Sequence, residues 1–232
     1  MKLHRFIGDF NIAEPTLTIT EREFVNQVRN VLRLNVGEEL LLSTGRGEEV
    51  RAKVTSYGDK YVEVAVVERM KNKSEPKRNV TLYLSILKRE NFELASQKAT
   101  EVGVTRIVPV VSARTVKMNI NKERIEKILK EAAEQAGRGI VPGIASAMSF
   151  KDALLSAKKN DLIIFFDMGG KDFNAKVLAK IKNVGIFVGP EGGWTKEEIA
   201  FAKKAKFVAL NLGALTLRAE TAATVASYLA CQ

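Results

Sequence analysis

The alternation of apolar runs with amphipathic segments after residue 79 is the feature that most constrains the fold of this chain. The apolar runs lie at 80–86, 106–111, 162–166, 184–189 and 207–213. Helix-like stretches separate them, and the clearest places Ile125, Leu129 and Ala132 on one face. Strands that alternate with helices form a parallel sheet covered by helices on both sides. Residues 73–232 are therefore predicted to form an α/β domain.

The first part of the chain has a different hydropathy pattern. Residues 39–70 alternate apolar and polar side chains, with turn signals at "GRG" and "YGD". Before them, helical spacing relates Phe24, Val28, Val31 and Leu32, and Gly37 can end that helix. Residues 1–72 are predicted to form a small β-barrel with a short helix. The polar stretch at 69–79, interrupted by proline, is expected to be a linker.

The charge of the chain is unevenly distributed. The net charge is +10, yet residues 1–75 hold 12 basic and 12 acidic side chains, so the whole surplus lies beyond them. A basic surface of this size favours a polyanion such as RNA. A solvated, lysine-rich surface explains the charge equally well.

Cysteine usage and hydropathy indicate the compartment. Cys231 is the one cysteine, so no disulfide can form within the chain, and a reducing environment is the simpler reading. No signal peptide is recognisable, and no apolar stretch reaches the length that a membrane span needs. A soluble cytoplasmic protein is expected.

A glycine-rich turn, "GPEGG", follows the apolar run at 184–189. Thr195 and Glu198 form a T-x-x-E capping box, which predicts a helix start directly after it. Ligands of open α/β sheets bind at such carboxyl ends of strands. The phosphate-loop signature is absent, and Glu191 within the turn would repel a polyphosphate. A neutral or cationic nucleotide-like ligand such as S-adenosylmethionine fits better, although a capping turn with structural glycines is the alternative.

A second strand-to-helix corner lies in "LNLGALTLRAETAATVASYLA". Gly213 follows the strand, and Arg218 and Glu220 stand where the last helix begins. Buried charges at such a place are costly without a partner. An Arg218–Glu220 surface pair that orders the helix start is the simpler alternative.

Three stretches together resemble the 16S rRNA (uracil(1498)-N(3))-methyltransferase family, also called small-subunit rRNA methyltransferase E, of the SPOUT superfamily. They are "NVLRLNVGEEL" near the front, "SQKATEVGVTRIVPVVSARTV" with "EAAEQAGRGIVP" in the middle, and "GPEGGWTKEEI" with "LGALTLRAETA" at the end. They occur in the family's order and span most of the chain. Their combination is much more selective than any single stretch.

The resemblance implies an N-terminal PUA-like β-barrel for RNA contact and a C-terminal SPOUT domain with a trefoil knot. It further implies a homodimer that acts on the small ribosomal subunit with S-adenosylmethionine. Backbone pockets at the strand ends would hold this cofactor, with the following residues: Phe166, Gly189, Pro190, Glu191, Gly192, Gly193, Leu210, Leu212, Gly213, Leu215, Thr216 and Leu217. The apolar face of the last helix is compatible with a dimer contact and equally with an internal core face.

The chain departs from the family pattern in two places. Leu215 and Thr216 replace the usual Arg-Ile before Arg218, so no role of that first arginine can be carried over. Asn26 and Gln27 stand where a histidine pair is usual, which puts an RNA contact there in doubt.

The implied reaction, methylation of uracil N3, needs a sulfonium donor, an in-line acceptor and removal of the N3 proton. Arg218 is the candidate to stabilise the developing uracil anion. Glu191 or Glu220 could accept the proton, and the residue pattern does not choose between them. His4 is expected to be structural. No metal is required, and no cysteine/histidine cluster is present.

Basic side chains near the family motifs are candidates for RNA phosphate contacts. They are Arg33, Lys88, Arg89, Lys98, Arg114 and Arg138. Each of them alone is compatible with a solvated surface charge. A non-catalytic RNA-binding or ribosome-assembly factor with the same fold is the rival function.

Overall fold

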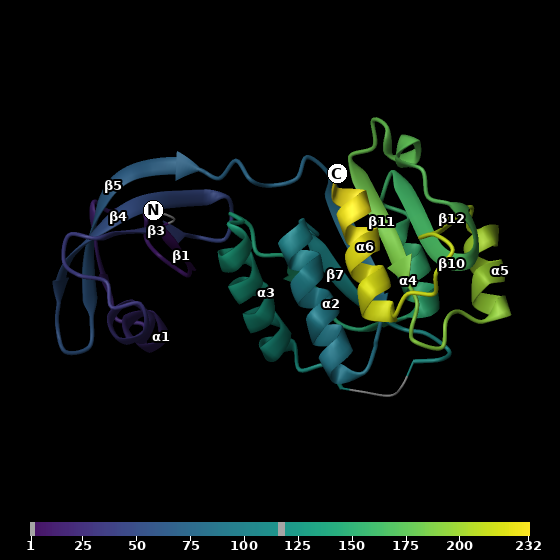
Figure 1. Cartoon of the computed structure of the whole chain (residues 1–232), viewed down its shortest axis with the longest axis horizontal. Helices are drawn as coiled ribbons and strands as arrows, with labels where there is room; N and C mark the ends of the chain where they lie inside the picture. Colours follow the sequence, from purple (N-terminus) through teal and green to yellow (C-terminus); the bar gives the residue numbers. More distant parts are fainter. Residues whose placement is uncertain (1–2, 116–118) are drawn as a thin grey trace. The chain divides into compact units, whose positions relative to one another are not determined.

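The structure is a computed structural model that describes residues 3–115 and 119–232. The chain forms two compact units (Figure 1). The first runs through Glu75 and also contains Ala133–Val141, whereas the second comprises Pro76–Ala132 and Pro142–Gln232. Within the described ranges, no helix has both the length and the apolar character needed to cross a membrane.

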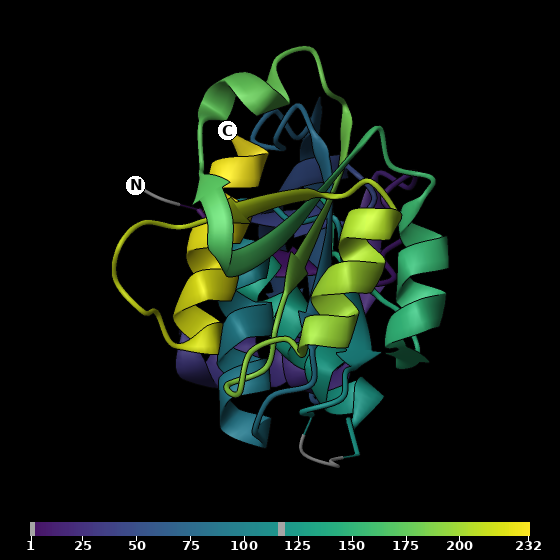
Figure 2. The same ribbon diagram turned by 90° about the vertical axis from the view of Figure 1, so that its right-hand side faces the viewer.

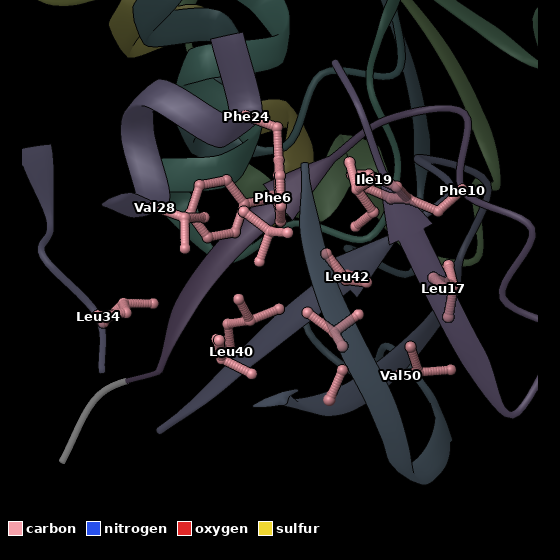
Figure 3. Close-up of a cluster of buried hydrophobic side chains, with 14 residues drawn as sticks. Phe6, Phe10, Leu17, Ile19, Phe24, Val28, Leu34, Leu40, Leu42 and Val50 are labelled. Carbon is pink, nitrogen blue, oxygen red and sulfur yellow. The ribbon is translucent and has the colours of Figure 1, made fainter. Parts of the chain in front are cut away.

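The first unit is built on a five-stranded sheet in the order β1-β3-β4-β5-β2. Its strands are β1 (His4–Ile7), β2 (Thr16–Ile19), β3 (Glu39–Ser43), β4 (Glu48–Tyr57) and β5 (Val62–Lys71). β1 pairs with β3 in parallel, and the other pairs are antiparallel. Figure 3 shows the buried side chains that this sheet and α1 (Arg22–Asn26) enclose, among them Phe6, Phe24 and Leu40.

The short helix of this unit changes its pitch after its first turn. After α1 the chain continues as a π-helical turn, η1 (Gln27–Val31), in which the Leu32 amide donates to the Gln27 carbonyl at 2.8 Å. Phe24 and Val28 are buried, whereas Val31, which shares their helical spacing, is 63% exposed. The wider i→i+5 turn rotates the following residues away from the core face.

Glu75 holds the returning segment 133–141 in the first unit. Its carboxylate accepts hydrogen bonds from the Gly139 amide at 3.0 Å, the Ile140 amide at 3.1 Å and the Arg138 guanidinium at 2.8 Å. The Arg138 side chain is only 3% exposed. The prediction of a phosphate contact for Arg138 is therefore corrected, because its charge is buried against Glu75. The predicted first domain, residues 1–72, also did not include this returning segment, which was assigned to residues 73–232.

The second unit contains the predicted parallel sheet, in the order β12-β10-β11-β6-β7-β8, with the short β9 (Met148–Ser149) also paired to β7. The strands in that order are β12 (Val208–Asn211), β10 (Leu162–Asp172), β11 (Asn183–Val188), β6 (Asn79–Ser85), β7 (Arg106–Val111) and β8 (Gly143–Ile144). All of these pairs are parallel, which confirms the prediction. β10 runs further than expected and shifts register against β12 between Phe166 and Lys171.

Helices cover both faces of this sheet, as Figures 1 and 2 show. α2 (Arg89–Val102) and α6 (Ala219–Cys231) pack on one face, and α4 (Phe150–Ala157) and α5 (Lys196–Lys204) cover the other. The remaining helices are α3 (Lys122–Ala136) and the 3₁₀ turn η2 (Ala175–Leu178). Tyr83 and Phe187 stack at 4.4 Å between ring centroids under α4 and α5. The trefoil knot stays a prediction.

Candidate functional site

A cavity of about 580 Å³ lies where β10, β11 and β12 meet the start of α6. The turn after β11 contributes 189–194, and the segment after β12 contributes Leu212 and 215–217. The first turn of α6 and the middle of β10 supply further walls. This is the edge of a parallel sheet at which ligands bind.

Most of the residues predicted to bind the cofactor line this cavity together. They are Phe166, Gly189, Pro190, Glu191, Gly192, Gly193, Leu212, Leu215, Thr216 and Leu217. Arg218 and Glu220 line it as well. Leu210 and Gly213 do not: Leu210 is a buried residue of β12, and Gly213 makes the turn after that strand with φ of 112°.

Trp194 determines the shape of the glycine turn, and sequence reasoning overlooked it. Its indole Nε1 donates to the Phe166 carbonyl at 3.0 Å, so the turn after β11 is tied to β10. A Cβ at Gly189 would lie 3.0 Å from the indole ring, which explains the glycine at that position. Gly193 has φ of 67°, a conformation that favours glycine. The sequence signal that could have identified Trp194 is its position as an aromatic residue directly after the glycines.

The capping box predicted after this turn is present. The Thr195 side chain accepts from the Glu198 amide, and the Glu198 side chain accepts from the Thr195 amide at 2.9 Å. Glu198 also accepts from the Ala113 amide at 2.8 Å. Beside it, the Arg114 guanidinium donates to the Gly192 carbonyl. The segment after β7 is thereby attached to the glycine turn.

The side chain of Glu191 is hydrogen-bonded to the start of α2. Its carboxylate accepts from the Lys88 amide at 3.2 Å and from the Asn91 side chain at 3.3 Å. Partial burial alone would raise the pKa of this carboxyl, but hydrogen bonds from its own amide, the Lys88 amide and Asn91 lower the pKa overall. Glu191 therefore serves as a cap for a helix whose own N-cap residue, Lys88, supplies none.

Glu220 has the opposite environment. The residue is 8% exposed, lines the cavity, and its Oε2 is buried with no hydrogen-bond partner. Within the described ranges no ion pair joins it to Arg218, so the alternative of an Arg218–Glu220 surface pair is not formed. Arg218 is exposed in extended conformation and is the N-cap residue of α6. The site thus holds a desolvated carboxylate beside a guanidinium that is exposed to solvent.

The remaining predicted RNA contacts lie in different places. Lys88 and Arg114 line the cavity. Arg89 pairs with a glutamate on α2, Glu93, and Lys98 pairs with Glu101. Arg33 is exposed in the first unit, with φ of 53°, and His4 lies there on β1.

Comparison with known proteins gives a consistent result. Residues 73–230 match the family described as RNA methyltransferase domain, and residues 28–67 match the RNA methyltransferase PUA domain. The ribosomal RNA small subunit methyltransferase E of Rickettsia conorii is 32% identical over 232 residues, which cover 97% of this chain and 94% of that protein. The enzyme of the same name from Bacillus subtilis is 32% identical over 222 residues, with 90% and 86% covered.

Solved structures agree with these relatives. A ribosomal RNA small subunit methyltransferase E from Neisseria gonorrhoeae, bound to S-adenosyl methionine, has a TM-score of 0.87 at 28% identity, with 97% of this chain and 95% of that chain covered. A putative methyltransferase from Legionella pneumophila, in complex with the same cofactor, has a TM-score of 0.85 at 27% identity, with 98% and 96% covered. On the combined match of both domain families and of near full-length relatives, this chain belongs to the ribosomal RNA small subunit methyltransferase E family.

Proposed function

We propose that this protein transfers a methyl group from S-adenosylmethionine to N3 of a uracil in 16S rRNA, at position 1498 by family resemblance. Relatives named for small-subunit rRNA methylation and structures bound to the cofactor support this proposal. The observation that carries it is the cavity at the ends of β10, β11 and β12, lined by the glycine turn and by Glu220, whose Oε2 is buried without a hydrogen-bond partner.

The residues of the cavity fit this cofactor. Its volume of about 580 Å³ falls in the range of small-molecule sites. A buried carboxylate oxygen without a hydrogen-bond partner is costly, so the Oε2 of Glu220 favours a cationic ligand such as a sulfonium. The glycine turn 189–193 and the segment 212–217 would hold the ligand through backbone groups. When bound, the cofactor supplies an electrophilic methyl group.

Glu220 is the carboxylate that we assign to the N3 proton. Glu191 already accepts hydrogen bonds from α2, and its lowered pKa makes it a weaker base. Glu220 differs in its contacts, because its Oε2 is buried without a hydrogen-bond partner. The proton that leaves N3 would pass to the Glu220 carboxylate, and N3 would take the methyl group that the bound cofactor supplies. Arg218 would donate to a uracil carbonyl oxygen, where the negative charge of the deprotonated ring gathers.

The test is methylation of small subunits purified from cells that lack this protein, followed by mass analysis of nucleosides. Glu220→Gln is expected to slow methylation about 100-fold or more, the usual contribution of a general base. Arg218→Ala is expected to act in the same direction. The Glu191→Gln variant makes the same change in charge and shape as Glu220→Gln. Its methylation rate is expected to stay within a few-fold of that of the wild type. A full rate for Glu220→Gln contradicts the assigned role.

A non-catalytic RNA-binding factor is the rival function. Leu215, which replaces the family's usual arginine, is 78% exposed beside the cavity and gives this rival its basis. Calorimetry with S-adenosylmethionine separates the two, because absence of binding would favour the rival.

We also propose a homodimer, a cytoplasmic location and a role of residues 1–72 in RNA contact. The family resemblance supports all three. Sedimentation equilibrium checks the first of them: a mass near 25.6 kDa, that of one chain, would contradict a dimer.

A further inference from the structure

We propose that a row of lysines at the amino edge of the second unit's sheet binds the rRNA backbone, remote from the nucleotide that is methylated. This inference rests on the proposed function. The lysine row consists of the residues that precede three neighbouring strands: Lys158 and Lys159 before β10, Lys180 and Lys182 before β11, and Lys203, Lys204 and Lys206 before β12. None of these lysines was predicted from the sequence to contact RNA, and none lines the cofactor cavity.

The pairing of the strands brings these lysines to one surface. β12, β10 and β11 are adjacent in the sheet and parallel, so their amino ends lie at the same edge. Leu162 of β10 is paired with Val184, and Ile164 with Val208. Because neighbouring strands are about 4.8 Å apart, the three strand starts span about 10 Å. The residues directly before these strands therefore lie close together.

The positive charge of the lysine row is not balanced by nearby carboxylates. All of its lysines are exposed, and they form no ion pair within the described ranges. The acidic side chain among the strand starts is Asp161, whose Oδ2 accepts from the amide and the side chain of Asn183 at 2.9 and 3.0 Å. Asp152 and Glu197 lie in the first turns of α4 and α5, at the far ends of these helices, and the acidic residues of β10 lie in its second half. The edge thus carries a large local excess of positive charge.

Other lysine-rich surfaces of this unit are arranged differently. On α3, Lys122 pairs with Glu126 at 3.5 Å, and Lys127 pairs with Glu131 at 3.9 Å. Interspersed charges of both signs are typical of a surface that meets only water. A patch of one sign instead attracts a polyanion and binds it through its phosphates.

The backbone at two of the lysines is strained. Lys180 and Lys206 have φ of 63° and 62°, in the left-handed region. This region is uncommon for a residue with a Cβ, and glycine or asparagine would make either turn with less strain. The dipole of α5 favours cations near its end, but it does not require a lysine at a left-handed position. Strained positions that carry a charge point to a role for that charge.

The chemistry and the place of the lysine row fit an RNA backbone. Lysine is a flexible point charge that contacts phosphates without reading the bases. At about 3.3 Å per residue, Leu162 at the start of β10 lies about 13 Å from Phe166 in the wall of the cavity. The lysine row and the cavity are therefore at opposite ends of the same strands. Together they would hold two separate parts of a large folded rRNA.

The experiment compares two double variants of the full chain. Lys180→Asn/Lys206→Asn removes two charges of the lysine row and introduces a residue that tolerates the left-handed conformation. Lys122→Gln/Lys127→Gln, the control, removes two exposed charges of α3, outside the row. Filter binding across a salt series uses two probes, protein-free 16S rRNA and small subunits purified from cells that lack this protein. The Tm of each variant is measured as well.

The Lys180→Asn/Lys206→Asn variant is expected to bind both probes about tenfold or more weakly at 0.1 M salt. Its plot of log affinity against log salt should flatten by about 1.4 to 1.8, because each lost phosphate contact removes about 0.7 on a single strand and about 0.9 on a duplex. Its Tm should be unchanged or higher, since asparagine relieves strain. The control should bind as the wild type does.

Two outcomes would overturn the proposal. One is equal affinities and equal salt slopes for the two variants. The other is a loss confined to small subunits and not seen with protein-free rRNA, which would identify a ribosomal protein as the partner. If the asparagine variant is unstable, Lys159→Gln/Lys182→Gln removes two charges of the lysine row without touching the left-handed turns, and the same weakening is expected.

Enzyme assays keep this test separate from that of the proposed function. Calorimetry should give the same S-adenosylmethionine affinity for the wild type and the Lys180→Asn/Lys206→Asn variant. In methylation of small subunits this variant should raise KM and leave kcat unchanged, as expected for a contact that only binds the substrate. A wild type that neither binds the cofactor nor methylates would refute the methyltransferase role. A variant with wild-type KM and wild-type RNA affinity would refute the lysine row alone.

Discussion

At the residue scale, two carboxylates that are equivalent in the sequence differ in their surroundings. Glu191 accepts hydrogen bonds from the start of α2 and has a lowered pKa, whereas Glu220 is buried with an unpartnered Oε2. Hydrogen bonds stabilise the charged form of the first, whereas the Oε2 of the second has no hydrogen-bond partner among the described residues. The division of labour proposed for the site follows from this difference.

Glu191→Gln should lower stability in a pH-dependent manner. Because the folded pKa of Glu191 is lowered, its charge contributes stability above the unfolded pKa of about 4.3, and this is lost as the pH falls through the folded value. Urea unfolding of wild type and variant should therefore differ at pH 7 and converge in acid. Glu126→Gln, an exposed change on α3, is the control. A difference independent of pH would contradict the capping role.

Trp194→Phe should loosen the cavity while keeping an aromatic ring in place. The change removes the Nε1–H donor to the Phe166 carbonyl, which costs about 1 to 3 kcal/mol of unfolding free energy. Cofactor affinity by calorimetry should fall as well. Phe201→Leu, at a side chain that is 45% exposed, should change neither quantity appreciably.

At the element scale, the starts of two helices organise the cavity. The capping box fixes where α5 begins, and Glu191 from the glycine turn caps α2. The indole of Trp194 ties the turn to β10, and Arg114 ties it to the segment after β7. Three strand-to-helix connections are therefore joined through one turn. A change in the backbone of this turn should alter the geometry of the whole site.

Gly189→Ala tests this arrangement. The added methyl would lie 3.0 Å from the Trp194 ring, so the ring or the turn must move, at a cost of about 1 to 3 kcal/mol. Cofactor affinity should fall about two- to tenfold if half of that strain falls on the bound turn. Gly143→Ala is the matched control, because its methyl meets no atom within 4 Å. Equal affinities for the two variants would count against the described packing of the turn.

At the scale of the whole molecule, the first compact unit is assembled from two separate parts of the chain. Glu75 joins them through the Gly139 and Ile140 amides and the buried Arg138. An ion pair of this kind is costly to break because it leaves a buried charge without a partner. Integrity of the first unit therefore depends on residues that lie within the predicted catalytic domain.

Glu75→Ala is expected to lower the unfolding free energy of the first unit by about 3 kcal/mol or more. Glu68→Ala removes a carboxylate that is 54% exposed and paired with Arg51, so it should cost less than about 1 kcal/mol. Urea denaturation followed by the tyrosine and tryptophan signals measures both. Similar effects of the two changes would show that Glu75 does not hold the segment.

The sequence by itself determined the elements and the family. Period-2 and period-3.6 patterns specify strands and helices locally, the T-x-x-E box specifies the start of α5, and the ordered motifs identify the relatives. It was also predictable that the glycine turn and the Arg218 corner lie close together, because parallel strands end at one edge of a sheet.

Only the tertiary structure decided which charges are available to a ligand. Glu191 meets Lys88, and Arg138 meets Glu75, across more than sixty residues of chain. Hydrogen bonding and burial depend on neighbours in space, which local spacing does not encode. A charged residue at a motif therefore reveals its role only once the fold shows what surrounds it.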